Sequence, residues 1–175
     1  QVGAPVIISN GGGPTGGYSI TENTFGPNVV AATDPNAGTV LSYSIIGGAD
    51  ALLFTIDPAT GAMQFINAPN FEAPADQNGD NAYQVIVQAS DGALVDTQVL
   101  TITVTNLNEA PVITALGGGA TGGYTIFENT LGPITISTVD PDAGTALTYT
   151  IVGGTDQTRF TLDQGGRKTA TTDAL

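Results

Sequence analysis

The acidic side chains are the residues of this sequence that could do chemistry, because they greatly outnumber the basic ones. The 175 residues include 16 Asp and Glu and only 3 Lys and Arg. The basic residues, Arg159, Arg167 and Lys168, all lie in the last 17 positions, so residues 1–158 have no cationic side chain. Carboxylates in such a chain are solvated, repel one another or bind metal cations. Nucleic-acid binding is not expected, because its affinity comes from Lys and Arg.

The residue types that are missing narrow the chemistry further. There are no cysteines and no histidines, which removes disulfides, most zinc sites and the commonest general base. Any bound metal should therefore be a hard cation held by oxygen, and we do not expect an enzyme. No apolar stretch is long enough for a transmembrane segment.

An internal repeat organises the chain. Residues 110–163 match residues 4–57 at a constant offset, with about 31 identities in 54 positions. This period is longer than that of solenoid repeats. Turn residues and acidic positions recur most, so we expect tandem domains, residues 1–108 and residues 109–175.

Each repeat contains one copy of a glycine-rich stretch, GGGPTGGYSITEN at 11–23 and GGGATGGYTIFEN at 117–129. A phosphate-binding loop would need Lys followed by Ser or Thr after the last glycine, and neither stretch has them. We expect instead a spacer that carries the chain from one sheet to the other and delivers Glu22 or Glu128 to the end of a domain.

A second acidic stretch, DQNGDN at 76–81, superficially resembles the start of an EF-hand. Its glycine stands at the fourth place instead of the sixth, and Val87 occupies the twelfth place where an EF-hand has Glu. Two readings stay open: a local calcium site formed by Asp76, Asn78 and Asp80, or a polar hairpin turn.

The elements that must position these side chains are short strands, because segments of alternating or β-branched residues are separated by Gly, Pro, Asn and Asp. In TQVLTITVT, Leu100, Ile102 and Val104 fall on one face of a strand. The expected strands of the first repeat are 6–9, 18–20, 28–32, 41–45, 53–56, 62–66, 83–88 and 95–105. The fold class is therefore all-β, with tandem Greek-key β-sandwiches, the second one incomplete.

Four motifs resemble those of cadherin domains, in particular the bacterial cadherin-like repeats. The Glu-Asn of ITEN and IFEN resembles the PEN signature, and NFE at 70–72 resembles DRE or DYE. QASDG at 88–92 resembles the AxDxG turn, and NLNEAP at 106–111 is similar to the DxNDNxP linker and its DVNEAP form. The motifs follow the family's order and cover the first repeat and the first half of the second.

The resemblance implies a calcium site at the joint between the two repeats. Oxygen atoms from carboxylates, amides and the backbone are the ligands that calcium takes. The ligands come from the first repeat, the linker and the VDPDAG loop of the second repeat, and they are Glu22, Asn70, Glu72, Asn106, Asn108, Glu109, Asp140 and Asp142. Asn70 and Asn106 each stand where the family has Asp, which weakens the match at those two positions.

The resemblance also implies incomplete sites at the two ends of the tandem. Asp34, Asn36 and Asp91 would complete a site with a preceding repeat, and Glu128 would point toward a following one. The alternative at these ends is that the side chains are ordinary solvated turn residues.

The second repeat is incomplete, because counterparts of the strands expected at 83–88 and 95–105 are not found among residues 109–175. Either the repeat is truncated, with an unrelated tail after Asp163, or another chain supplies the strands. An open sandwich exposes strand edges and apolar core, so the second repeat is expected either to self-associate or to be poorly ordered.

The expected function is that of a calcium-rigidified rod segment in a large extracellular bacterial protein, secreted or at the cell surface. It would contact neighbouring cadherin-like repeats and mediate cell-surface, matrix or homophilic adhesion. The alternatives are a calcium-dependent carbohydrate-binding module that takes a polysaccharide, or a filament subunit that assembles by strand complementation.

Overall fold

The computed structural model describes residues 3–163, 165 and 167–170. The described chain is all-β, as predicted, with short strands and three 3₁₀ helices of three residues each. No helix in this part of the chain is long and apolar enough to span a membrane. The chain divides into two compact units, Gln1–Leu107 and Asn108–Leu175. That these units are separately folding domains stays a prediction.

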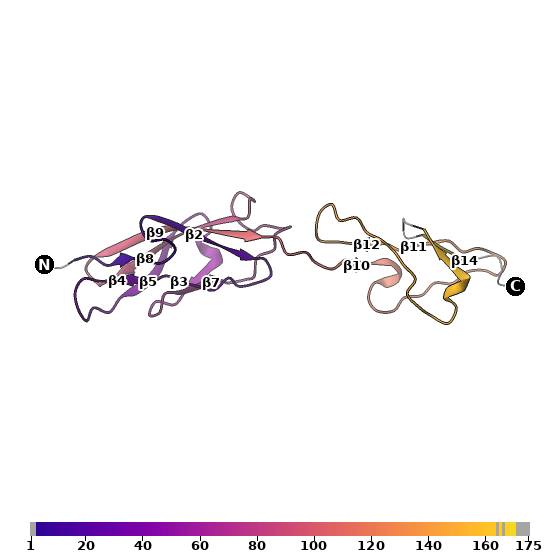
Figure 1. The fold of residues 1–175 in the computed structure, drawn as a ribbon, viewed down its shortest axis with the longest axis horizontal. Helices are drawn as coiled ribbons and strands as arrows, with labels where there is room; N and C mark the ends of the chain where they lie inside the picture. Colours follow the sequence, from indigo (N-terminus) through magenta and orange to yellow (C-terminus); the bar gives the residue numbers. More distant parts are fainter. Residues whose placement is uncertain (1–2, 164, 166, 171–175) are drawn as a thin grey trace. The chain divides into compact units, whose positions relative to one another are not determined.

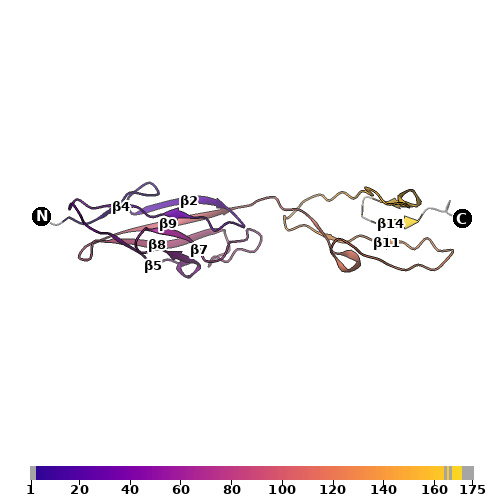
Figure 2. The same ribbon diagram turned by 90° about the horizontal axis from the view of Figure 1, so that it is seen from below.

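The first unit contains a four-stranded sheet, a three-stranded sheet and a strand pair. The four-stranded sheet has the order β2-β9-β8-β5, in which β2 and β9 are parallel and the other neighbours antiparallel. Figure 2 shows β2, β9 and β8 extended along the unit. The strands of this sheet are β2 (Thr15–Thr21), β5 (Ser42–Gly47), β8 (Ala82–Ser90) and β9 (Val95–Thr105).

The remaining strands of the first unit form the opposite layer. The three-stranded sheet has the order β3-β7-β6, and β1 pairs with β4. Figure 1 shows β4 near the N-terminal end of the unit. The strands are β1 (Val6–Ile7), β3 (Asn28–Val29), β4 (Ala32–Thr33), β6 (Phe54–Ile56) and β7 (Ala62–Phe65).

The core of the first unit lies between these layers and depends most on the β8–β9 hairpin. The hairpin supplies seven of the twelve buried apolar residues: Tyr83, Val85, Val87, Ala89, Leu100, Ile102 and Val104. The predicted alternation in β9 is confirmed, because Leu100, Ile102 and Val104 are the buried set. The ring of Phe65 packs 4.1 Å from that of Phe54 and 5.0 Å from that of Tyr83, centroid to centroid.

Two sequence-based expectations for the first unit need correction. The strand expected at 28–32 is two strands, because the chain changes sheets there: β3 pairs with β7, whereas β4 pairs with β1. The glycine-rich stretch is a spacer only in its first part, where Gly11, Gly12 and Gly13 have positive φ. Gly16 and Gly17 belong to β2, where a Cβ on Gly17 would lie 2.5 Å from the Thr101 carbonyl oxygen. Glycine permits this close pairing of β2 with β9.

The second unit repeats one layer of the first. β10 (Val112–Ile113) pairs with β12 (Thr138–Val139) as β1 pairs with β4. A three-stranded sheet of order β11-β14-β13 corresponds to β3-β7-β6 and contains β11 (Ile134–Thr135), β13 (Phe160–Leu162) and β14 (Arg167–Ala170). An unrelated tail after Asp163 was one of the two alternatives for this repeat, and in the structure β14 of this tail takes the place of β7 in the backbone pairing.

The other layer is missing from the described part of the second unit. Residues 121–127 and 148–153, which match β2 and β5 in sequence, form no strand. None of the residues 108–163 is buried, and Ile113 is 54% exposed whereas its counterpart Ile7 is 0% exposed. The second sandwich is therefore open, as the sequence predicted.

Candidate metal site

The parallel pairing of β2 with β9 places Glu22 at one end of the first unit. The Glu22 N–H continues this ladder by donating to the Thr105 carbonyl at 3.0 Å. The next residue, Asn23, turns the chain with φ of 59°, a backbone conformation that Asn tolerates better than most residues. The hydroxyl of Thr24 closes the turn by donating to the Thr21 carbonyl at 2.7 Å.

The carboxylate of Glu22 is buried, with 0% of the residue exposed. Its Oε1 accepts from the Leu107 N–H at 2.9 Å, and its Oε2 accepts from the Phe71 N–H at 2.8 Å. These two amides belong to the NLNEAP linker and to the NFE motif. One side chain thus ties three of the recognised motifs together, and each of its oxygens keeps a further lone pair for a ligand.

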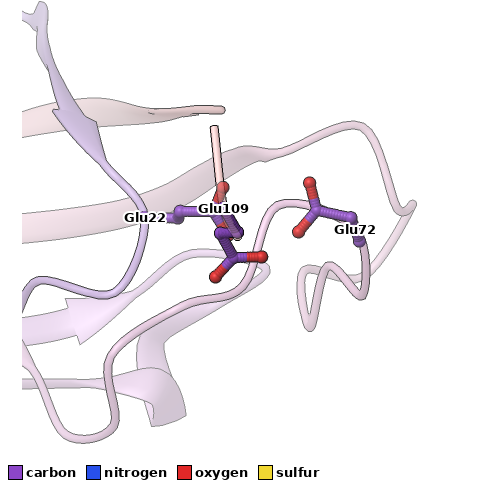
Figure 3. A group of neighbouring side chains, drawn as sticks. All are labelled: Glu22, Glu72 and Glu109. Carbon is purple, nitrogen blue, oxygen red and sulfur yellow. The ribbon is translucent and has the colours of Figure 1, made fainter. Parts of the chain in front are cut away.

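Glu72 and Asn106 lie at the same end of the unit. One carboxylate oxygen of Glu22 and one of Glu72 lie within 4.8 Å of each other, and the Asn106 side-chain amide donates to Glu72 Oε1 at 3.1 Å. Figure 3 shows Glu22 and Glu72 with Glu109, the second residue after Leu107. Asn70, two residues before Glu72, is exposed, and its Oδ1 accepts from the Ala73 N–H at 2.7 Å.

The electrostatics of this end favour a cation. A buried carboxylate is normally paired with Lys or Arg, or coordinates a metal, and residues 1–158 contain no basic side chain. Backbone amides stabilise the Glu22 charge in part, but Glu72 adds a second charge beside it. The oxygen ligands offered here suit Ca²⁺ or Mg²⁺ and not a thiolate- or imidazole-binding metal.

The second unit gathers its own acidic residues beside the linker. The Glu109 N–H donates to Asp142 Oδ2 at 2.6 Å, and the Asp142 N–H donates to Asp140 Oδ1 at 3.0 Å. Asn108 is exposed, and its side-chain amide donates to the Glu109 carbonyl at 3.3 Å. The VDPDAG loop and the second half of the linker are therefore held together within this unit.

The residues expected at the N-terminal end of the first unit lie away from Glu22. Asp34 Oδ1 accepts from the backbone N–H and the side-chain amide of Asn36, both at 2.7 Å, while Asp34 Oδ2 is buried with no partner among the described residues. Asp91 lies in the β8–β9 turn, where the N–H groups of Leu94 and Ala93 hold its pKa below the usual value. Asp96, which the sequence analysis missed, anchors β1 by accepting from the Ile7 N–H at 2.7 Å.

Glu128, the counterpart of Glu22, is exposed. Its turn is the same, since Asn129 has φ of 59° and the Thr130 hydroxyl donates to the Phe127 carbonyl at 2.7 Å. Counterparts of Phe71 and Leu107 are not present in residues 108–175 to bind its carboxylate.

The DQNGDN loop has the hydrogen bonds of a polar turn. Asp76 accepts from the N–H groups of Asp80 at 2.9 Å and Asn81 at 3.3 Å, and the Asn78 amide donates to Asp80 Oδ2 at 2.8 Å. The loop is anchored by Asp50, whose buried carboxylate accepts from the Gln77 N–H at 2.8 Å and from the Gln84 N–H at 2.7 Å. Sequence reasoning missed Asp50, because a single Asp two residues after a Gly-Gly pair looks like any other turn residue.

Comparison with known proteins identifies the fold. No family model matches the chain. The chain is 27% identical over 143 residues to human protocadherin Fat 1. The matched segment is 76% of this chain but only 3% of Fat 1. A stretch of 36 residues, which is 21% of this chain, is 50% identical to part of halomucin of Haloquadratum walsbyi. The matched part is so small a share of halomucin that it rounds to 0% of that protein's length.

Two solved structures illustrate the likeness. Human protocadherin-24 EC1-2 matches with a TM-score of 0.61 and 19% identity, over 98% of this chain and 78% of that one. Drosophila N-cadherin EC1-4 matches with a TM-score of 0.57 and 19% identity, over 99% of this chain and 42% of that one. The chain therefore has the β-sandwich fold of cadherin extracellular domains.

Proposed function

We propose that this chain is a calcium-binding structural and adhesive segment of a large extracellular protein of the bacterial cadherin-like kind, and that it is not an enzyme. The observation that carries the proposal is the Glu22 and Glu72 pair, two carboxylates within 4.8 Å in a part of the chain without a basic side chain. The cadherin-type fold supports it, because the pair lies on the motifs by which the sequence resembles that family.

In this proposal the first unit supplies the carboxylates of Glu22 and Glu72, with Asn106 beside them. Asn70 belongs to the proposed set, because its Oδ1 accepts one hydrogen bond, from the Ala73 N–H, and keeps a second lone pair. Ca²⁺ takes 6–8 oxygen ligands in flexible geometry, whereas Mg²⁺ demands a near-octahedral site and keeps several waters. A mixed set of carboxylate, amide and backbone oxygens on loops suits calcium better.

The second unit is proposed to complete the set with Asn108, Glu109, Asp140 and Asp142. Covalent connectivity supports this step. Leu107 is held by Glu22, and Glu109 is held by Asp142. The Cα atoms of two residues separated by one other are at most about 7.6 Å apart. Calcium at the linker would neutralise carboxylates of both units and stiffen the connection between neighbouring repeats.

The end residues extend the same proposal. Asp34, Asn36 and Asp91 would bind calcium with a preceding repeat, and Glu128 would do so with a following one. Asp76, Asn78 and Asp80 are better explained as a turn, because the Asp76 and Asp80 carboxylates accept local backbone hydrogen bonds and the Asn78 amide donates to Asp80. A polysaccharide as partner stays an untested alternative, and no observation in the described residues favours it.

The test is a thermal melt of the full chain in EGTA, in millimolar Mg²⁺ and in millimolar Ca²⁺. Extracellular calcium modules bind with a Kd of about 10⁻⁴ to 10⁻³ M, so a tenfold excess over Kd stabilises by about 1.4 kcal/mol. We expect calcium to raise the melting temperature and magnesium to raise it far less. An identical melt in all three conditions would overturn the proposal.

A second measurement addresses the linker. Small-angle scattering in calcium should give a shorter maximum dimension for Asp140→Asn than for the parent chain, because the second unit loses a ligand charge. Asp156→Asn is the matched control, since Asp156 is exposed and forms an exposed ion pair of 3.7 Å with Arg159, three residues later. Equal dimensions for the parent and Asp140→Asn would assign linker rigidity to another cause.

A further inference from the structure

Glu72 lies on a long connection that has no regular structure to position it. Residues 66–81 link β7 to β8, and this fully described range contains no strand or helix. Figure 3 shows Glu72 on this loop, beside Glu22. Because no strand ladder binds the backbone here, the place of the Glu72 carboxylate depends on side chains that hydrogen-bond to the loop.

The residue directly before Glu72 is held on both sides of its backbone. The Phe71 N–H donates to Glu22 Oε2 at 2.8 Å, and the Phe71 carbonyl accepts from the Asn81 side-chain amide at 2.9 Å. The first bond is made by a proposed metal ligand, whereas the second comes from a residue that the sequence analysis did not single out. Asn81 is only 9% exposed, so water competes little for its bond to Phe71.

The backbone of Asn81 is itself fixed from two directions. Its N–H donates to Asp76 Oδ1 at 3.3 Å, and its carbonyl accepts from the Val104 N–H of β9 at 2.9 Å. Asn81 has φ of 63°, a left-handed conformation that Asn tolerates better than most residues. The acidic loop therefore presents the Asn81 side chain from a backbone anchored to β9, the strand whose Thr105 carbonyl binds the Glu22 N–H.

We propose that Asn81 is a positioning residue for the metal site, and that the DQNGDN loop is the brace that holds it. The inference rests on the proposed calcium function and adds to it a residue that does not touch the ion. Asn81 keeps the Phe71 peptide in the orientation in which its N–H reaches Glu22 and the next side chain, Glu72, lies beside Glu22. Groups that orient the ligands of a metal typically change its affinity by about 10-fold to 100-fold when they are mutated.

The test is Asn81→Gly in the full chain, because glycine adopts the left-handed backbone without steric cost and removes only the side chain. Calcium is titrated at a temperature at which parent and variant are both folded, and the amide signals of Phe71 and Leu107 are followed by NMR. We expect the calcium Kd to rise about 10-fold or more. A loss of stability alone would not change this Kd, since only folded chains are titrated.

A second readout needs no calcium. In EGTA, hydrogen exchange of the Phe71 amide should become about fivefold faster in Asn81→Gly, because the peptide loses a hydrogen bond of ordinary strength. The Ile7 amide is the internal reference. It also donates to a carboxylate, that of Asp96, but at the N-terminal end of the unit, so its exchange should match that of the parent.

Asn10→Gly is the matched control. Asn10 also has a left-handed backbone, with φ of 52°, and its side chain accepts from the Asn28 amide at 2.8 Å. Asn10 precedes β2, whereas Glu22 follows it, so this variant should keep the calcium Kd within about twofold of the parent.

Asn81→Asp is a second variant that keeps the side-chain shape but replaces the amide donor by a charged acceptor. The added charge by itself would attract calcium. A Kd that rises in this variant as well therefore assigns the effect to the lost hydrogen bond.

The inference is wrong if Asn81→Gly binds calcium as the parent does, if exchange at Phe71 is unchanged in EGTA, or if Asn10→Gly weakens binding equally. It is also wrong if Asn81→Asp binds calcium more tightly than the parent. A parent chain that does not respond to calcium would instead refute the proposed function. The exchange experiment in EGTA would then still decide whether Asn81 holds the segment that carries Glu72.

Discussion

Neutralising Glu72 should stabilise the first unit without calcium and remove its response to calcium. Two unit charges at the 4.8 Å limit within which these oxygens lie repel by about 3.5 kcal/mol at an effective dielectric of 20 and by less than about 1 kcal/mol in bulk water. Glu72 is half-buried, so its repulsion with Glu22 falls between these limits, at about 1–2 kcal/mol. In Glu72→Gln this repulsion disappears, while the side-chain oxygen that accepts from Asn106 is kept.

The assay is thermal unfolding followed in the near-ultraviolet, where the packed rings of Phe54, Phe65 and Tyr83 report on the first unit. A gain of about 1–2 kcal/mol corresponds to roughly 4–12 °C for a unit of this size. In EGTA we expect Glu72→Gln to melt above the parent. In calcium the order should reverse or the difference vanish, because the parent gains the stabilisation of the bound ion and the variant does not.

The control for this experiment is Glu128→Gln. Glu128→Gln changes the net charge by the same amount at an exposed position. The unfolding free energy of the first unit should therefore change by less than about 0.5 kcal/mol. Two results would refute the reasoning. In the first, Glu72→Gln melts below the parent in EGTA, which would mean that the two carboxylates do not repel. In the second, the variant keeps the full calcium response, which would remove Glu72 from the ligand set.

Three further predictions follow from single contacts of the first unit. Glu22→Ala should lower the unfolding free energy by about 1–3 kcal/mol even in EGTA, because two backbone amides lose their acceptor; denaturant titration measures this. Gly17→Ala should lower the unfolding free energy by about 1–3 kcal/mol, since the new Cβ would lie 2.5 Å from the Thr101 carbonyl oxygen of β9. Gly123→Ala is the control: its new Cβ would meet nothing within 4 Å, so this variant should be neutral in the same titration. Burial raises the pKa of Tyr18 to about 12, so its stabilising contribution is complete below the unfolded value near 10 and is lost as the pH rises through 12. An absorbance titration of the tyrosines should show a phenol that ionises near pH 12 in the parent, and this step should be absent from Tyr18→Phe.

The local turns of this protein are determined by the sequence alone. The Glu-Asn-Thr segment makes the same turn in both units, with φ of 59° at Asn23 and Asn129 and a Thr hydroxyl bonded to the carbonyl three residues earlier. The strand β9 was predicted with its bounds and its buried face, because its alternation is long and regular. These features depend on neighbours in sequence, which the printed residues supply.

Burial and strand pairing were decided by the tertiary structure. Glu22 and Glu128 share their local sequence, yet Glu22 is buried and Glu128 is exposed, because the amides that hold Glu22 come from residues 49 and 85 positions away. In the same way TGGYSIT at 15–21 is a strand, whereas TGGYTIF at 121–127 is not, since only the first lies beside β9. A strand needs a partner for its backbone hydrogen bonds, and a buried carboxylate needs donors; in this chain both come from residues distant in the sequence.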